Sequence, residues 1–159
     1  LHRRRHSFPT RRSSDLLYPP AWVIARRVIE PLQLGPYTLP VNSMAVMSPW
    51  VVHHDARLYP APNRFDPERF TPEAKAARHR FAYFPFSAGP RNCIGEGFAW
   101  AEGVLVLASL ARRCRFELAP HQQVAPEPLI TLRPRYGMRM RVVLRGAGAA
   151  RPPAAPAPA

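Results

Sequence analysis

FPFSAGPRNCIGEGFAWAE, residues 84–102, is the stretch that decides the fold of this sequence. It places Cys93 two residues before Gly95, where an apolar pattern with helical spacing begins. A helix N-terminus offers unpaired N–H groups and a partial positive charge, and both favour a thiolate over a thiol. Because the thiolate is the form of cysteine that binds metals, this position is compatible with a metal ligand but does not by itself indicate one.

The residues around Cys93 indicate which of several roles the cysteine has. A lone cysteine at a helix start is usually an inert packed thiol and occasionally a nucleophile. Here the cysteine belongs to the pattern Phe86-x-x-Gly89-x-Arg91-x-Cys93-x-Gly95. This pattern resembles the haem-binding signature of cytochromes P-450. The resemblance implies that Cys93 is the thiolate ligand of the iron of haem b.

The other four residues of the pattern have chemistry that suits a haem. Gly89 permits a tight turn, and Gly95 lets the helix backbone approach a flat macrocycle. Arg91 can pair with a haem propionate through a charge-assisted fork. Phe86 can cover the sulfur side of the ring and limit access of water. All four are therefore predicted cofactor-binding residues.

The resemblance extends over residues 17–144. The stretch Pro67-Glu68-Arg69-Phe70 matches the PERF motif of the family. The ExxR motif that partners this arginine in the family should end at position 16, which is Leu16 here. Helix I, which carries the proton-delivering residues of the family, has no counterpart in the sequence, so the catalytic residues are unknown.

Further site residues follow from the same resemblance. Arg26 matches a propionate-binding arginine, with Arg27 as the neighbouring alternative, and His53 matches a histidine that also contacts a propionate. Two segments match strands and turns that line the substrate pocket of the family. The candidate lining residues are Ala21, Val23, Ile24, Ile130 and Thr131.

Local patterns predict short elements around one long helix. Residues 95–113 are apolar around most of a helical circumference, which predicts a buried helix. The remaining patterns predict strands at 22–29, 44–47, 116–118, 129–132 and 138–144, a hairpin at 32–39, a helical turn at 49–55 and a proline-rich meander at 59–72. The resemblance implies a fold that is mainly α with β (α+β). It would be the C-terminal part of the P-450 fold, with hairpins, a meander, the Cys loop, a buried helix L and a terminal β region.

The two ends differ in composition from the middle. Residues 1–16 are rich in Arg and Ser, lack periodicity and resemble a translated sequencing adapter. We therefore predict that they are non-native or disordered. Residues 17–144 form the predicted haem-binding part, and the Pro/Ala-rich residues 145–159 form a predicted disordered tail.

Bulk properties exclude several classes of protein. The net charge of +13 permits a nucleic-acid-binding module, but the arginines are scattered without a basic helix face, so we expect no nucleic acid as a partner. Two cysteines indicate no disulfide framework, which fits a reducing compartment. No apolar stretch approaches the roughly 20 residues of a membrane span. We expect a cytoplasmic, bacterial protein.

The predicted function is that of a haem-thiolate monooxygenase, of which this chain is a fragment that is inactive by itself. As the resemblance implies, the full-length parent inserts one atom of O2 into a small apolar organic substrate. Its electron donor would be a ferredoxin or a flavodoxin-like reductase. The alternatives are a peroxide-using or isomerase-type haem-thiolate enzyme, a non-functional fragment, and a basic nucleic-acid-binding module.

Overall fold

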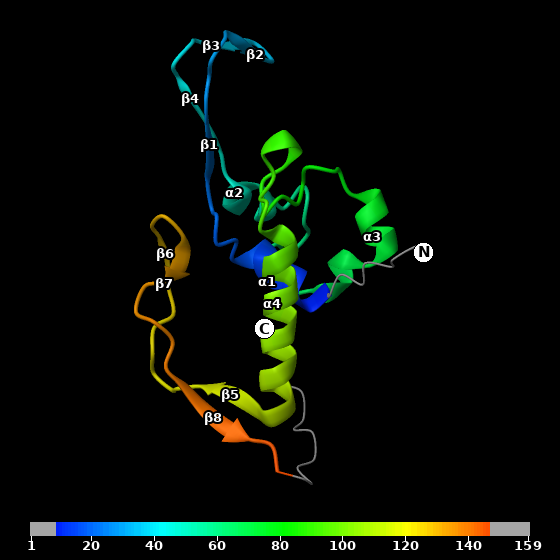
Figure 1. The fold of residues 1–159 in the computed structure, drawn as a ribbon, viewed down its shortest axis with the longest axis vertical. Coiled ribbons are helices and arrows are strands. Elements are labelled where there is room, and N and C mark those ends of the chain that lie inside the picture. The colour runs from blue at the N-terminus through cyan, green and yellow to red at the C-terminus, as the bar shows by residue number, and fades with distance from the viewer. Residues whose placement is uncertain (1–8, 147–159) are drawn as a thin grey trace.

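The computed structural model describes residues 9–146, and helix α4 (Glu96–Arg113) runs through its middle (Figure 1). A two-stranded ladder lies at the C-terminal end of this helix, and the other ladders stand away from it. The architecture is mixed α and β, as predicted. No helix within residues 9–146 is long and apolar enough to cross a lipid bilayer.

Helix α1 (Pro9–Leu17) corrects the disordered alternative of the prediction for residues 9–16, and the non-native alternative stays a prediction. Ser13, Leu16 and Leu17 share one face at helical spacing, and all three are buried. The Ser13 hydroxyl donates a hydrogen bond of 2.9 Å to the backbone carbonyl of Asp66. The Arg- and Ser-rich composition concealed this short buried face. Residues 1–8 and 147–159, including nearly all of the predicted tail, lie outside the described part of the chain.

The N-terminal strands form two ladders at the expected places. Strand β1 (Ile24–Arg27) pairs antiparallel with β4 (Met44–Met47), with Arg26 opposite Ala45. Strands β2 (Leu32–Leu34) and β3 (Tyr37–Leu39) form the predicted hairpin. Its turn contains Gly35 at φ 54°, a backbone conformation that glycine adopts without a Cβ clash.

Capping side chains start the short helices that follow. Ser48 caps α2 (Pro49–His53), and its hydroxyl accepts a hydrogen bond from the Val51 N–H. The meander contains the 3₁₀ turn η1 (Pro67–Phe70) and leads to α3 (Pro72–Ala77). The buried core joins these elements to α1, and its members are Leu16, Tyr59, Phe70 and Ala82, with Tyr83 packed against them.

Helix α4 forms where predicted but is not buried, which corrects the expectation of a buried helix L. It follows the 3₁₀ turn η2 (Gly89–Arg91), and none of its residues is buried. Large apolar side chains along it are exposed, among them Phe98 and Leu105. An apolar helix is buried only where packing partners exist, and the described residues cover little of this one.

The C-terminal strands complete the fold. Strand β5 (Cys114–Leu118) pairs antiparallel with β8 (Met140–Leu144), as the predicted terminal β region requires. Strand β6 (Pro126–Pro128) pairs with β7 (Leu132–Pro134). Residues 129–131, predicted as part of a strand, instead connect these two, because the pairing register places the chain reversal there.

Candidate functional site

The Cys93 loop, residues 84–95, is closed by its own backbone hydrogen bonds. The Cys93 N–H donates to the Phe86 carbonyl at 3.0 Å, and the Asn92 N–H donates to the Gly89 carbonyl at 3.0 Å. Ser87 and Gly89 adopt positive φ values of 69° and 74°. These two residues reverse the chain, and the reversal brings Cys93 back beside Phe86.

The sulfur of Cys93 faces outward at the start of α4. Cys93 is exposed, and a Cβ built on Gly95 would lie 3.7 Å from the cysteine Sγ. Ile94 and Phe98, in the same segment, also expose large apolar side chains. An accessible sulfur among exposed apolar groups suits a flat, largely apolar cofactor better than a polar metal site.

Two of the other predicted haem residues, Phe86 and Arg91, belong to the Cys93 loop itself. The half-buried ring of Phe86 is 6.0 Å from the ring of Trp100 on α4. Arg91 is exposed in η2. Within the Cys93 loop, Phe86 therefore packs toward α4 and Arg91 faces solvent.

Arg26 contacts the Cys93 loop at Ser87, which is sixty-one positions away in the sequence. Its Nη2 donates a hydrogen bond of 3.0 Å to the hydroxyl of Ser87. Arg27, the next residue of the strand, is exposed, because successive side chains of a strand point to opposite faces. Of the two arginines considered from the sequence, Arg26 is the one in contact with the loop.

His53 has surroundings that differ from those expected of a propionate ligand. It is 0% exposed, and its Nε2 accepts a hydrogen bond of 3.2 Å from the Phe84 N–H. Its ring stacks on Tyr83 at 5.4 Å and meets Phe84 edge-on at 5.6 Å. Burial lowers the pKa of His53 to about 4, so the ring is neutral near pH 7. The observed contacts favour a structural role for this side chain.

The two predicted substrate-lining segments meet in the structure. The Leu132 N–H donates to the Pro20 carbonyl at 2.8 Å, and the Trp22 indole donates to the Leu129 carbonyl at 2.7 Å. These bonds join the chain before β1 to the connection between β6 and β7. The predicted lining residues before and at the start of β1 are partly buried; they are Ala21, Val23 and Ile24. The predicted lining residues between β6 and β7, Ile130 and Thr131, are exposed.

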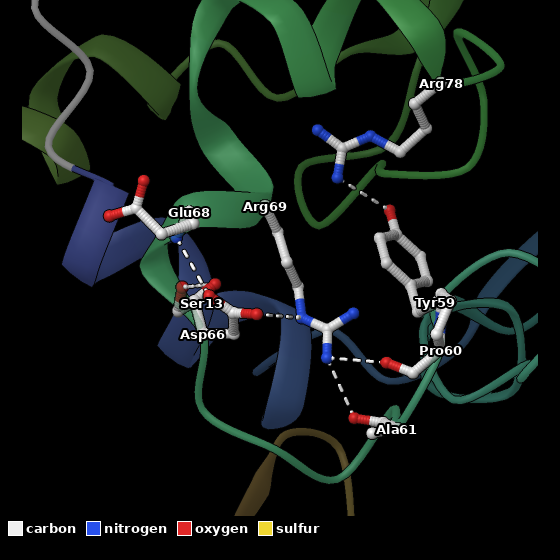
Figure 2. Close-up of polar contacts among 8 residues, drawn as sticks. All are labelled: Ser13, Tyr59, Pro60, Ala61, Asp66, Glu68, Arg69 and Arg78. Carbon is white, nitrogen blue, oxygen red and sulfur yellow. Dashed lines mark hydrogen bonds and ion pairs between the residues drawn. The ribbon is translucent and has the colours of Figure 1, made fainter.

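Figure 2 shows the surroundings of Arg69, the arginine of the PERF motif. Its Nη2 donates to the carbonyls of Pro60 and Ala61, both at 2.8 Å. Its Nε lies 4.0 Å from an Asp66 carboxylate oxygen. Its side chain is only 10% exposed, so Arg69 is not a surface residue but joins parts of the meander through these hydrogen bonds.

Burial also shifts two acidic groups beside this core. It raises the pKa of Asp15, against the opposing effect of Arg11 and Arg12. Burial raises the pKa of Tyr83 as well, with a smaller contribution from Asp15. Both shifts favour uncharged side chains where α1 packs on the chain leading to Cys93.

Sequence reasoning missed three residues of the site. Ser87 binds Arg26, the Phe84 backbone binds His53, and Trp100 packs on Phe86. Trp100 lies seven residues after Cys93 on the predicted helix, so helical spacing could have indicated it. The other two contacts bridge distant parts of the chain and have no local pattern.

The comparisons with known proteins agree on one family. The sequence matches the Cytochrome P450 family over residues 17–138. It is 40% identical to cyclooctatin synthase of Streptomyces melanosporofaciens over 116 residues, which are 73% of this chain and 25% of that protein. It is 38% identical to human cytochrome P450 4V2 over 132 residues, 82% of this chain and 25% of that protein.

The fold agrees with solved structures of the same kind. The retinoic acid-bound cyanobacterial CYP120A1 matches with a TM-score of 0.81 and 30% identity, over 86% of this chain and 32% of that one. The chain thus spans about a quarter of the curated relatives and a third of the solved structure. With a match over most of its length, this chain belongs to the cytochrome P450 family.

Proposed function

We propose that residues 17–144 are the haem-binding part of a haem-thiolate monooxygenase and that Cys93 is its iron ligand. The full-length protein would insert one oxygen atom from O2 into a small apolar organic substrate. Membership of the P450 family supports the reaction class. The observation that carries the ligand assignment is the exposed Cys93 sulfur at the start of α4, inside the pattern from Phe86 to Gly95.

The cofactor we propose is haem b, whose iron supplies the oxygen chemistry when it is bound. Cys93 would hold the iron, and the lack of a side chain on Gly95 would leave room for the macrocycle. Arg26 and Arg91 carry positive charge beside the loop and would bind the two propionates. Phe86, packed on Trp100, would keep water from the sulfur.

The pocket for the substrate would form where the two joined segments approach the haem. The bonds from Leu132 to Pro20 and from Trp22 to Leu129 hold these segments together. The predicted lining residues are mostly aliphatic, which suits an apolar substrate; they are Ala21, Val23, Ile24, Ile130 and Thr131.

An acidic ferredoxin or a flavodoxin-like reductase is the electron donor that we propose. Arg80 and Arg91 are exposed before and within the Cys93 loop and would attract it. Arg112 and Arg113 also flank the loop in sequence, but they end α4. A rise of 1.5 Å per residue puts them about 25 Å from its start, so they do not belong to this docking face. A cytoplasmic location in a bacterium stays a prediction.

The ligand assignment is tested by Cys93→Ser in the full-length protein, with Cys114→Ser as the matched control. Cys114 is buried, and its thiol donates to the Leu110 carbonyl at 3.3 Å. We expect Cys93→Ser to abolish the thiolate-type band of the reduced carbon monoxide spectrum and the control to retain it. A thiolate-type band that survives Cys93→Ser would show that the assignment is wrong.

A further inference from the structure

His53 is enclosed at the C-terminal end of α2, beside the chain that enters the Cys93 loop. The ring is 0% exposed and contacts Tyr83 and Phe84, the two residues that precede the loop's first turn. In this structure His53 is closed off from solvent, and the contacts of its ring are with other residues of the chain. The role of His53 must therefore be sought in the protein contacts that it makes.

The ring nitrogens of His53 have different surroundings. Nε2 accepts a hydrogen bond from the Phe84 N–H, so the proton of the neutral ring is on Nδ1. Within the described residues, Nδ1 is buried without a hydrogen-bond partner. Backbone groups of Leu16 and Asp15 also lie near the ring and raise the pKa of His53, an effect that burial outweighs.

Two backbone hydrogen bonds connect the segment that starts at Phe84 to Cys93. The Phe84 carbonyl accepts from the Ser87 N–H at 3.1 Å, and the Phe86 carbonyl accepts from the Cys93 N–H at 3.0 Å. Residues 84–87 therefore form a brace that holds the backbone of Cys93. His53 fixes the start of this brace, and Arg26 fixes its end through Ser87.

We infer that His53 is a positioning residue for Cys93, which acts by fixing the Phe84 N–H and through it the brace of residues 84–87. This inference rests on the proposed role of Cys93 as iron ligand, and it replaces the expected propionate contact of His53. A sulfur that must bond iron needs a fixed backbone, because small displacements of a ligand loop weaken the bond to the metal. The lowered pKa of His53 supports the inference, since only the unprotonated Nε2 can accept the Phe84 N–H.

The test compares two amides of different reach in the full-length, haem-bound protein. The amide group of His53→Gln reaches the place of Nε2 and can still accept the Phe84 N–H. The amide group of His53→Asn ends at the place of Nδ1 and cannot. The readout is the ratio of thiolate-type to other absorption in the reduced carbon monoxide spectrum, measured at equal haem content. We expect this ratio to fall roughly tenfold in the Asn variant, which corresponds to about 1.4 kcal/mol, and to be largely kept in the Gln variant.

His54→Asn is the matched control. His54 stacks on Trp50 at 4.2 Å, and its Nδ1 lies 2.8 Å from the Trp50 carbonyl, so its polar contact stays within α2 and its cap. It should leave the ratio unchanged. Equal ratios in the Gln and Asn variants of His53 would overturn the positioning role, as would a loss of haem affinity with an unaltered ratio. Survival of the thiolate-type band in Cys93→Ser would instead overturn the proposed function itself, so the two failures are distinguishable.

Discussion

The guanidinium of Arg26 and the hydroxyl of Ser87 are joined by a hydrogen bond of 3.0 Å between strand β1 and the Cys93 loop. This bond fixes the guanidinium of Arg26, and therefore its positive charge, beside the loop. It also distinguishes Arg26 from Arg27, which the sequence alone leaves as alternatives.

Replacing Arg26 by Ala in the full-length protein should weaken haem binding roughly tenfold or more. Hydrogen bonds to charged groups contribute about 1.5–3 kcal/mol, and each 1.4 kcal/mol is a factor of ten. Arg27→Ala is the matched control, because Arg27 is exposed on the opposite face of β1. Haem transfer to apomyoglobin measures the affinity. Equal losses in the two variants would contradict the assignment of Arg26 to the site.

The stability of the full-length protein should rise between about pH 4 and pH 6.5 because of His53. Burial holds the pKa of His53 at about 4, against 6.5 in the unfolded chain. The unfolded state therefore binds more protons in this interval, and stability increases with pH until it levels off above 6.5. The full effect is about 3 kcal/mol at 1.36 kcal/mol for each pKa unit.

Asp15 makes stability fall as the pH rises. Burial raises its pKa, so the folded state keeps the proton at a pH where the unfolded state has lost it. The comparison of the protein with its His53→Phe variant cancels this contribution. Urea unfolding at a series of pH values, followed by circular dichroism, gives the free energy of unfolding. The His53→Phe variant should lose the rise that the parent shows, and His54→Phe should keep it. A parent and a His53→Phe variant with parallel pH profiles would refute the prediction.

Residues 1–159 expressed alone, with α1 and its buried Leu16 kept, should aggregate or remain partly unfolded, with weak and non-specific uptake of haem. The exposed apolar side chains of α4 lack partners within the described residues, and they include Phe98, Leu105, Val106, Leu107 and Leu110. Several hundred Å² of missing apolar contact corresponds to several kcal/mol, a large part of a typical stability of 5–15 kcal/mol. Near-UV circular dichroism and assays of oxygen- and peroxide-driven turnover measure the outcome.

The double substitution Leu105→Gln and Leu107→Gln sharpens this prediction. It should make the isolated chain more soluble, because these side chains face water there, and should destabilise the full-length protein, where we expect them to be covered. A soluble isolated chain that unfolds cooperatively and shows Cys93-dependent turnover would disprove the expectation of an inactive fragment.

Local sequence determined the elements that depend on neighbouring residues. The Gly35-Pro36 pair gives the hairpin of β2 and β3, because its turn needs a positive φ that glycine adopts freely. The apolar spacing after Gly95 gives α4, and the residues from Phe86 to Gly95 give the family. The burial of α4 could not be predicted in the same way, since burial depends on what packs against a helix.

Tertiary structure alone decided which distant side chains form hydrogen bonds to the Cys93 loop. His53 is thirty-one positions from Phe84, and Arg26 is sixty-one from Ser87, so no periodicity in the sequence relates these partners. Packing of α1 and α2 beside the loop encloses His53 and makes its ring an internal hydrogen-bond acceptor. The sequence determined that Cys93 precedes a helix in a haem-binding pattern, because that relationship is local. The fold decided what holds Cys93 in place, because contacts across the chain form only when its elements pack together.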